Sequence, residues 1–263
     1  MKMEELFSHT FKALSQQIEA QRTEGRRWWQ QRQGTASDFC RAMVAMGYMT
    51  DSQVQQAVER YRLGVSRDGA VIFWQIDDCD LLRDGKIMHY RPDDHRDHDR
   101  KPTWASYLMR KNGRLPEYWN TDHCLFGLHL LSEELIVKSE EFLSGESVAR
   151  NATARTIAVV EAEKTAVIMS AIRPEYLWLA TGGKTELSVA RLSPLQGRRI
   201  ILFPDTDETG QTYRDWYAIA EAAASVFDHP VTVSSILEQR ATPAQRTAKI
   251  DIADLLIYNE FKE

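Results

Sequence analysis

Short apolar runs alternate with helical patterns through the second half of the chain. Apolar runs at Thr156–Val160, Tyr176–Ala180 and Ile200–Phe203 have the length of buried strands, and a fourth is expected at 231–235. Helical patterns follow at 164–171, 212–227 and 253–258. Strands that alternate with helices in this way predict a parallel sheet with right-handed crossovers.

The first half of the chain has a different pattern. Apolar residues at helical spacing predict a helix near the N-terminus, namely Phe7, Phe11, Leu14 and Ile18. Two more helices are expected at 37–46 and 51–60, with Ser37 and Asp51 as their N-caps. Strand-like runs at 70–76 and 86–90 follow the turn dipeptides Asp68-Gly69 and Asp84-Gly85 and predict a hairpin. Leu125 to Leu128 reads as a buried turn.

These patterns suggest three segments in an α/β protein. Residues 1–60 form a helical N-terminal segment, residues 61–150 a small α+β subdomain, and residues 151–263 the parallel sheet flanked by helices. The polar stretch at 139–155 is the expected boundary.

Composition narrows the class of protein. The chain has 263 residues, 43% hydrophobic and 27% charged, as is ordinary for a soluble globular protein. It has neither an apolar stretch of the roughly 18 residues that would span a membrane nor a secretory signal, so we expect no membrane partner. Its three cysteines are far apart, which argues against a disulfide framework or zinc ribbon and favours the cytoplasm. The net charge of −5 means that any nucleic acid would need a local basic patch.

Acidic residues follow two of the predicted parallel strands. Glu161 ends the first run, and Asp205-Thr-Asp207 follows Pro204 at the end of the third. Between them, the second run ends in Gly182-Gly183-Lys184. Ligand sites of open α/β sheets lie beyond the carboxyl ends of the strands, and carboxylates are the oxygen ligands that Mg²⁺ prefers. Taken alone, residues 205–210 could also be a solvated turn, but three successive strands that lead to one edge favour a site.

Two other clusters have alternative interpretations. One basic and aromatic cluster could bind a nucleic-acid backbone and stack bases, or its tryptophans could pack inside while its arginines stay solvated. Its members are Arg26, Arg27, Trp28, Trp29 and Arg32. His95-x-x-His98 has metal-ligand spacing, but the mixed charge around it favours an exposed loop.

The acidic motifs resemble those of the toprim domain, which bacterial-type primases, topoisomerases and certain nucleases share. The residues that show this resemblance are Glu161 and the segment from Pro204 to Gly210. Further segments resemble primase-like proteins of bacterial mobile elements, so that the likeness covers about residues 60–258. They are Tyr61-Arg-Leu-Gly64, Val71-Ile-Phe73, Gly85-Lys-Ile-Met88, His123-Cys-Leu-Phe-Gly127 and Val160-Glu-Ala-Glu-Lys-Thr-Ala166.

The resemblance implies roles for particular residues. Glu161 would be a metal ligand or general acid/base, and Asp205 and Asp207 would be catalytic Mg²⁺ or Mn²⁺ ligands. Asp251 and Asp254 match a further acidic motif and could hold a second metal. The chain departs from many primases in having Thr165 where they carry an aspartate, and in lacking a zinc-binding module.

The function implied is a primase-like nucleotidyltransferase that makes short primers on single-stranded DNA from nucleoside triphosphates during DNA replication, with a helicase or other replication protein as a further partner. Lys164, Lys184 and Lys86 are the predicted nucleotide or phosphate contacts, and Arg62 and Lys101 the predicted DNA contacts. A toprim nuclease and a non-catalytic module that binds single-stranded DNA or a replication partner are the alternatives. Because carboxylates held together repel one another, we expect at least one to have a raised pKa without metal.

Overall fold

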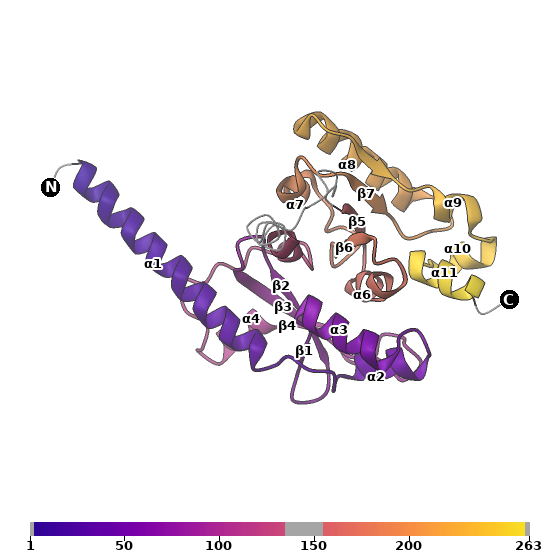
Figure 1. Cartoon of the computed structure of the whole chain (residues 1–263), viewed down its shortest axis with the longest axis horizontal. Helices are drawn as coiled ribbons and strands as arrows, with labels where there is room; N and C mark the ends of the chain where they lie inside the picture. The colour runs from indigo at the N-terminus through magenta and orange to yellow at the C-terminus, as the bar shows by residue number, and fades with distance from the viewer. Residues whose placement is uncertain (1–2, 135–154, 261–263) are drawn as a thin grey trace, which may run out of the picture. The chain divides into compact units, whose positions relative to one another are not determined.

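The computed structural model describes residues 3–134 and 155–260, and the chain divides into two compact units (Figure 1). Unit 1 is Met1–Cys124 and unit 2 is Leu125–Glu263. The border predicted between residues 150 and 151 lies outside the described residues. No helix in the described part of the chain is both long and apolar enough to cross a membrane.

Unit 1 joins helices to a small antiparallel sheet of order β1-β2-β3-β4. Its helices are α1 (Met3–Gln30), α2 (Asp38–Ala45), α3 (Asp51–Tyr61) and α4 (Ala105–Lys111), and its strands are β1 (Gly64–Val65), β2 (Val71–Ile76), β3 (Leu82–Met88) and β4 (Thr103–Trp104). The predicted N-cap Ser37 is confirmed, since its side chain accepts a hydrogen bond from the backbone N–H of Cys40. The prediction for α3 was wrong by one residue. Thr50 is the N-cap and forms a capping box with Gln53.

The predicted turn at Asp84-Gly85 was also wrong, because both residues lie inside β3. Gly85 is required there by packing, since a Cβ atom on it would come within 2.4 Å of the indole of Trp74. The hairpin turns earlier, after β2. There Asp77 Oδ1 accepts hydrogen bonds from the backbone N–H groups of Cys79 and Leu81, both at 2.9 Å. A side-chain acceptor of this kind closes a turn without glycine.

Unit 2 confirms the predicted fold class, an all-parallel sheet flanked by helices. Its four strands have the order β6-β5-β7-β8 and are β5 (Thr156–Val160), β6 (Tyr176–Ala180), β7 (Ile200–Phe203) and β8 (Val231–Val233). Its helices are α6 (Glu163–Ile172), α7 (Val189–Leu192), the 3-10 helix η1 (Ser193–Leu195), α8 (Gln211–Phe227), α9 (Ile236–Arg240), α10 (Pro243–Ala248) and α11 (Ile252–Glu260). Figure 1 shows α6 and α8 on opposite sides of the sheet. The predicted turn at Leu125 is also confirmed, since Leu128 N–H bonds to its carbonyl and both side chains are buried.

The strand order creates a place for a ligand between β5 and β7. The chain leaves β5 through α6 to β6 on one side, and leaves β7 through α8 to β8 on the other. Such a reversal is the topological switch point at which open α/β sheets bind ligands, beyond the carboxyl ends of the strands. The last residues of the two strands, Val160 and Phe203, pair directly. Glu161 and Asp205 therefore follow adjacent strands at the same edge.

Candidate functional site

Three loops meet at the carboxyl edge of β5 and β7. The backbone N–H of Gly182 donates to the carbonyl of Glu161 at 2.9 Å, which ties the Gly-Gly loop to the end of β5. The backbone N–H of Thr206 donates to the carbonyl of Ile250 at 3.0 Å, which ties the loop after β7 to the start of α11. Asp251 is thereby brought beside the Asp-x-Asp segment. We call Glu161, Asp205, Asp251 and Asp254 the acidic edge.

Asp205 is the centre of the acidic edge. Its Oδ1 atom is buried and accepts no hydrogen bond from the described residues. Burial first, and then the carboxylates of Asp251, Glu161 and Asp254, raise the pKa of Asp205 well above its usual range, while Lys164 opposes the rise. The expectation of a carboxylate with a raised pKa is confirmed. These four residues act on Asp205 electrostatically, so the fold gathers groups far apart in sequence.

Asp207 has a different role from Asp205, although it lies only two positions away. Its Oδ1 accepts hydrogen bonds from the backbone N–H groups of Thr209 (2.8 Å) and Gln211 (3.1 Å) and from the Thr209 hydroxyl (2.7 Å). Its Oδ2 accepts from the backbone N–H of Thr212 at 2.6 Å. These bonds hold the pKa of Asp207 far below its usual range despite partial desolvation. The carboxylate therefore caps α8, where N–H groups lack partners within the helix.

Asp251 and Asp254 cap α11 reciprocally. Asp251 Oδ1 accepts from the backbone N–H of Asp254 at 2.9 Å, and Asp254 Oδ2 accepts from the backbone N–H of Asp251 at 3.1 Å. The hydroxyl of Thr165, a buried residue of α6, donates to Asp251 Oδ2. The residue that departs from the primase pattern thus supports a neighbouring carboxylate, and it adds no charge to an already acidic edge.

The two predicted phosphate-contacting lysines of unit 2 flank this edge. Lys164 is the second residue of α6, whose N-cap Ala162 makes no side-chain capping bond. Lys184 is exposed and follows Gly182, whose φ of +87° is a conformation that favours glycine. A cation on a glycine loop and another at a helix N-terminus both suit phosphate oxygens.

The three residues of unit 1 that we predicted to contact nucleotide or DNA lie in different local environments. Lys86 lies in β3 and is half-buried, and Lys101 is exposed in an irregular segment. Arg62 forms an ion pair with Asp80 and stacks over the ring of Trp29 at 4.6 Å from its centroid. With these partners Arg62 supports the packing of unit 1, and its predicted contact with DNA stays a prediction.

The basic and aromatic cluster separates into a packed part and a solvated part. Trp28 stacks on Trp119 with ring centroids 4.2 Å apart, so the packing interpretation is confirmed for this tryptophan. Beside it lies a groove of about 680 Å³ with an apolar floor that includes Trp74 and Ile87. Four arginines line this arginine groove, namely Arg27, Arg32, Arg67 and Arg114. The sequence did not predict that Arg67 and Arg114 belong to this groove, because they lie on loops that are far from the cluster along the chain.

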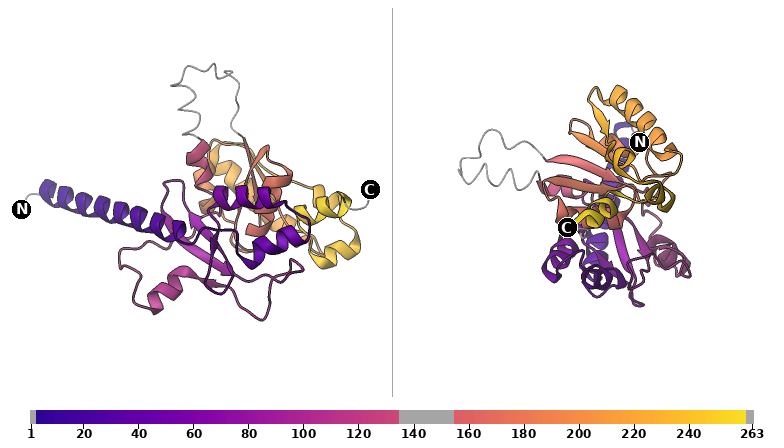
Figure 2. Two further views of the ribbon diagram at one scale, coloured as in Figure 1. Left: turned by 60° about the horizontal axis from the view of Figure 1, so that its bottom comes forward. Right: turned by 90° about the vertical axis from the view of Figure 1, so that its right-hand side faces the viewer.

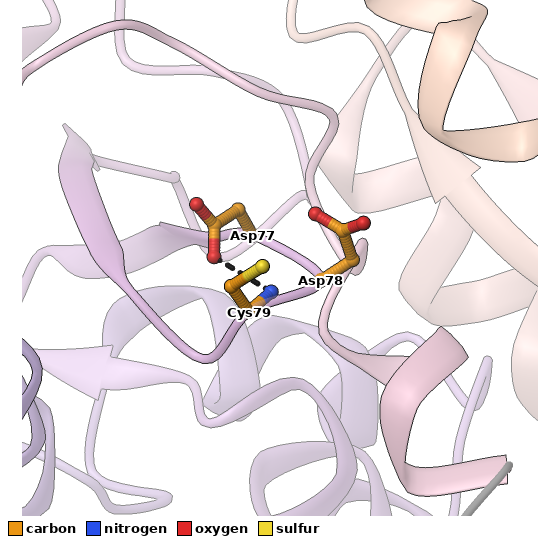
Figure 3. Close-up of side chains that lie close together, drawn as sticks. All are labelled: Asp77, Asp78 and Cys79. Carbon is orange, nitrogen blue, oxygen red and sulfur yellow. Dashed lines mark hydrogen bonds between the residues drawn. The ribbon is translucent and has the colours of Figure 1, made fainter.

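A further group in unit 1 also has metal-ligand residue types. Asp77, Asp78 and Cys79 each offer a ligand atom within 4.8 Å of the others (Figure 3). The oxygens of Asp77 are already engaged, since Oδ1 accepts from two backbone N–H groups and Oδ2 lies 2.7 Å from Nε of Arg83. This group therefore holds the β2–β3 turn. No other trio of such side chains in the described residues meets the same distance limit. The carboxylates of the acidic edge therefore lie farther apart than three ligands of one bound ion would.

Comparisons with known proteins give a family and a likeness to a solved structure. A family model described as "Domain of unknown function (DUF6371)" matches residues 37–206. No curated protein matches the chain. The chain is similar to the crystal structure of the primase fragment of the bacteriophage T7 primase-helicase protein, with 15% identity and a TM-score of 0.43, over 79% of this chain and 67% of that one. A function therefore has to be argued from this chain's own side chains.

Proposed function

The chain belongs to the family described as a domain of unknown function (DUF6371), and we propose that it is a metal-dependent, primase-like nucleotidyltransferase that acts on single-stranded DNA. The observation that carries the proposal is Asp205. It is a carboxylate with a buried oxygen to which no described residue donates a hydrogen bond, and it is held among other carboxylates at the switch point of a parallel sheet. Burying a charge without a partner is costly, and a cation removes that cost.

The donor set fits a hard divalent cation. Oxygen ligands from carboxylates are what Mg²⁺ and Mn²⁺ take, and no sulfur or imidazole ligand belongs to the acidic edge. Asp205 and Glu161 would hold the ion. Asp251 and Asp254 would hold a second one only if the hydrogen bonds that both oxygens of Asp251 accept rearranged. When bound, such ions supply charge stabilisation to the attacking and leaving oxygens of a phosphoryl transfer.

The other residues of the edge position these groups. Asp207 fixes the loop that carries Asp205 to the N-terminus of α8 through four accepted hydrogen bonds. Thr165 fixes Asp251 through its hydroxyl. Glu161 would also serve as general acid or base for the attacking hydroxyl. The ligand role that the resemblance gives Asp207 would need these bonds to rearrange.

The proposed substrates are anionic. Lys164 and Lys184 would contact the phosphates of a nucleoside triphosphate, assisted by the N-terminus of α6. The arginine groove supports a nucleic-acid template, because Arg32, Arg67 and Arg114 form no ion pair with any described residue. Lys86, Lys101 and Arg62 are the further template contacts that we propose. A replication protein such as a helicase, in the cytoplasm, would deliver the template.

The decisive experiment is primer synthesis on a single-stranded template. The full chain with Mn²⁺ or Mg²⁺ and labelled nucleotides should give short labelled products, and Asp205→Asn should give none. Asp99→Asn, an exposed carboxylate change in unit 1, is the matched control and should synthesise as the wild type does. Failure of the folded wild type on every template would contradict the proposal.

Two other outcomes would point to different functions. Cleavage of nucleic acid without added nucleotides, lost in Asp205→Asn, would make the same acidic edge a nuclease centre. Binding of single-stranded DNA that is unchanged by a chelator and by Asp205→Asn, with no synthesis or cleavage, would make the protein a non-catalytic binding module.

A further inference from the structure

The arginine groove of unit 1 combines an apolar floor with cations at its rim. It lies on the face of the sheet where Trp28 of α1 and Ala105 of α4 pack against the cluster of Ile72 and Trp74. Figure 2 shows α4 on the side of this sheet away from α2 and α3. All residues that line the groove belong to unit 1, so this unit alone forms it.

Two glycines shape the floor of the groove. Gly85 of β3 pairs with Trp74, and a Cβ atom on it would come within 2.4 Å of the indole. On the other side, a Cβ atom on Gly64 of β1 would come within 2.7 Å of Nε1 of the same ring. The indole of Trp74 therefore lies across both neighbouring strands. Together with the half-buried side chain of Ile87, it gives the groove a flat apolar floor.

The two acidic residues that line the groove already have partners. Glu24 forms an ion pair with Arg27 at 3.2 Å. Asp68 accepts a hydrogen bond from the Ser66 hydroxyl at 2.5 Å, and its other oxygen lies 3.1 Å from Nε2 of His89. Neither carboxylate therefore neutralises the remaining arginines of the groove.

Three arginines supply the unpaired positive charge of the groove. Arg32 is half-buried, and Arg67 and Arg114 are exposed. They come from three separate segments, which follow α1, join β1 to β2, and follow α4. Their side chains form no ion pair or hydrogen bond with any described residue. Positive charges gathered beside an apolar floor favour an anion that also has an apolar face.

A single strand of nucleic acid has both of these features. In a duplex the bases are stacked inside, and a concave protein surface meets only the phosphates and sugars of the backbone. In a single strand the bases unstack and lie on apolar or aromatic surfaces, while arginines contact the phosphates. The volume of about 680 Å³ lies within the range of about 300 to 1,000 Å³ that is usual for small-ligand sites, so a base with its flanking phosphates fits.

We propose that the arginine groove captures the template as a single strand. One unstacked base lies on the floor that Trp74 and Ile87 form, and Arg32, Arg67 and Arg114 contact the phosphates on either side of it. The identification of this strand as a template rests on the proposed function. Capture itself needs neither a metal ion nor the acidic edge, because no residue of that edge lines the groove.

The test is fluorescence anisotropy of a short labelled oligonucleotide with the full chain, in a chelator and without nucleotides. The wild type should bind the single strand about tenfold more tightly than the duplex of the same sequence, because only the single strand offers an unstacked base. A strand of abasic sites keeps the phosphates but has no bases, and it should also bind about tenfold more weakly.

The groove variant is Arg67→Ala with Arg114→Ala. It should bind the single strand about tenfold more weakly, and the slope of log affinity against log salt concentration should fall by about 1.4, or about 0.7 for each lost phosphate contact. The matched control, Arg96→Ala with Arg110→Ala, removes two exposed arginines of unit 1 that do not line the groove and should bind as the wild type does. Tryptophan fluorescence checks that unit 1 is folded in both variants.

Four results would each overturn the inference. They are equal affinity for single strand and duplex, equal affinity for the abasic strand, an equal loss of affinity in the control variant, and competition by polyglutamate as strong as by unlabelled single strand. The last would make the groove a site for acidic peptides.

Failure of this inference is distinguishable from failure of the proposed function. Asp205→Asn should bind the single strand as the wild type does, because capture does not use the acidic edge. Capture in the groove without any primer synthesis would contradict the proposed function alone. Primer synthesis by a groove variant whose affinity for the single strand is unchanged would contradict the capture site alone.

Discussion

Buried carboxylates occur in both units, but their partners differ. In unit 1, Asp84 is buried and accepts hydrogen bonds from the backbone N–H groups of Gly85 (2.7 Å) and Ser106 (2.9 Å) and from the Ser106 hydroxyl. His123 Nε2 lies 3.3 Å from its second oxygen. In unit 2, by contrast, Asp205 keeps a buried oxygen that no described residue bonds.

The difference separates a structural carboxylate from one that we propose to be functional. A buried charge that accepts several hydrogen bonds stabilises the fold around it, and removing it leaves its donors unsatisfied. A buried charge that lacks donors and faces other carboxylates destabilises the fold unless a ligand compensates. Asp207 behaves like Asp84, although it belongs to the same motif as Asp205. Substitutions at these positions should therefore have opposite effects on stability and activity.

The largest effect should come from Asp205→Asn. We expect metal-dependent activity to fall by about 1,000-fold or more, equivalent to about 4 kcal/mol, because the substitution removes a charged ligand. In a chelator the same variant should unfold at a higher temperature than the wild type, as measured by calorimetry. A variant that is less stable than the wild type in a chelator would contradict this.

The pH dependence of that stabilisation has a definite sign. Because the pKa of Asp205 is raised in the folded protein, the folded state holds its proton more tightly than the unfolded state. The wild type without metal should therefore lose stability as pH rises from about 4, the ordinary aspartate pKa, through the raised value. Asp205→Asn should remove this loss, so its advantage should grow with pH.

Asp84→Ala should have the next largest effect, on stability alone. It leaves the donors of Ser106 and His123 unsatisfied inside unit 1, and we expect a loss of about 3 kcal/mol in the free energy of unfolding. Asp122→Ala, an exposed neighbour of His123, is the control and should change stability by less than about 0.5 kcal/mol. Denaturant unfolding would measure both free energies, provided that the dependence on denaturant concentration has the same slope in each variant. Equal losses of unfolding free energy in Asp84→Ala and Asp122→Ala would contradict the structural role of Asp84.

Asp207→Ala should cost less, about 1 to 2 kcal/mol, as is usual for the loss of a helix cap. The pKa of Asp207 is lowered in the folded state, so its contribution should be complete above the unfolded-state value near 4 and be lost as pH falls further. Its pH dependence is thus opposite to that of Asp205. If the stability of Asp205→Asn and of Asp207→Ala, each relative to the wild type, changed with pH in the same direction, the two residues would not differ as the structure indicates.

Thr165→Val should have the smallest effect, about 1 kcal/mol, from losing the single hydrogen bond to Asp251. Thr165→Ser keeps the hydroxyl and is the control. The metal concentration needed for half-maximal thermal stabilisation should rise in the valine variant and stay unchanged in the serine variant. No rise in the valine variant would contradict the role given to the Thr165 hydroxyl.

Much of unit 2 follows from local sequence. The apolar runs that became β5, β6 and β7 are bounded by Glu161, Thr181 and Pro204, and the helical pattern between them requires parallel strands. That reasoning alone brings Glu161 and Asp205 to one edge. Unit 1 was harder to predict, because Asp84-Gly85 is also a common turn dipeptide. Only the packing of Trp74 over Gly85 shows why a glycine lies inside a strand.

The sequence by itself determined the order of strands and helices and the types of residue at the ends of the strands, because periodicity and capping depend on near neighbours in the chain. The tertiary structure decided which carboxylates remain available. Asp205 and Asp207 look equivalent in the sequence, but the unpaired N–H groups of α8 engage one of them, and burial beside Asp251 isolates the other. Burial and hydrogen bonding depend on distant segments, which no local pattern contains.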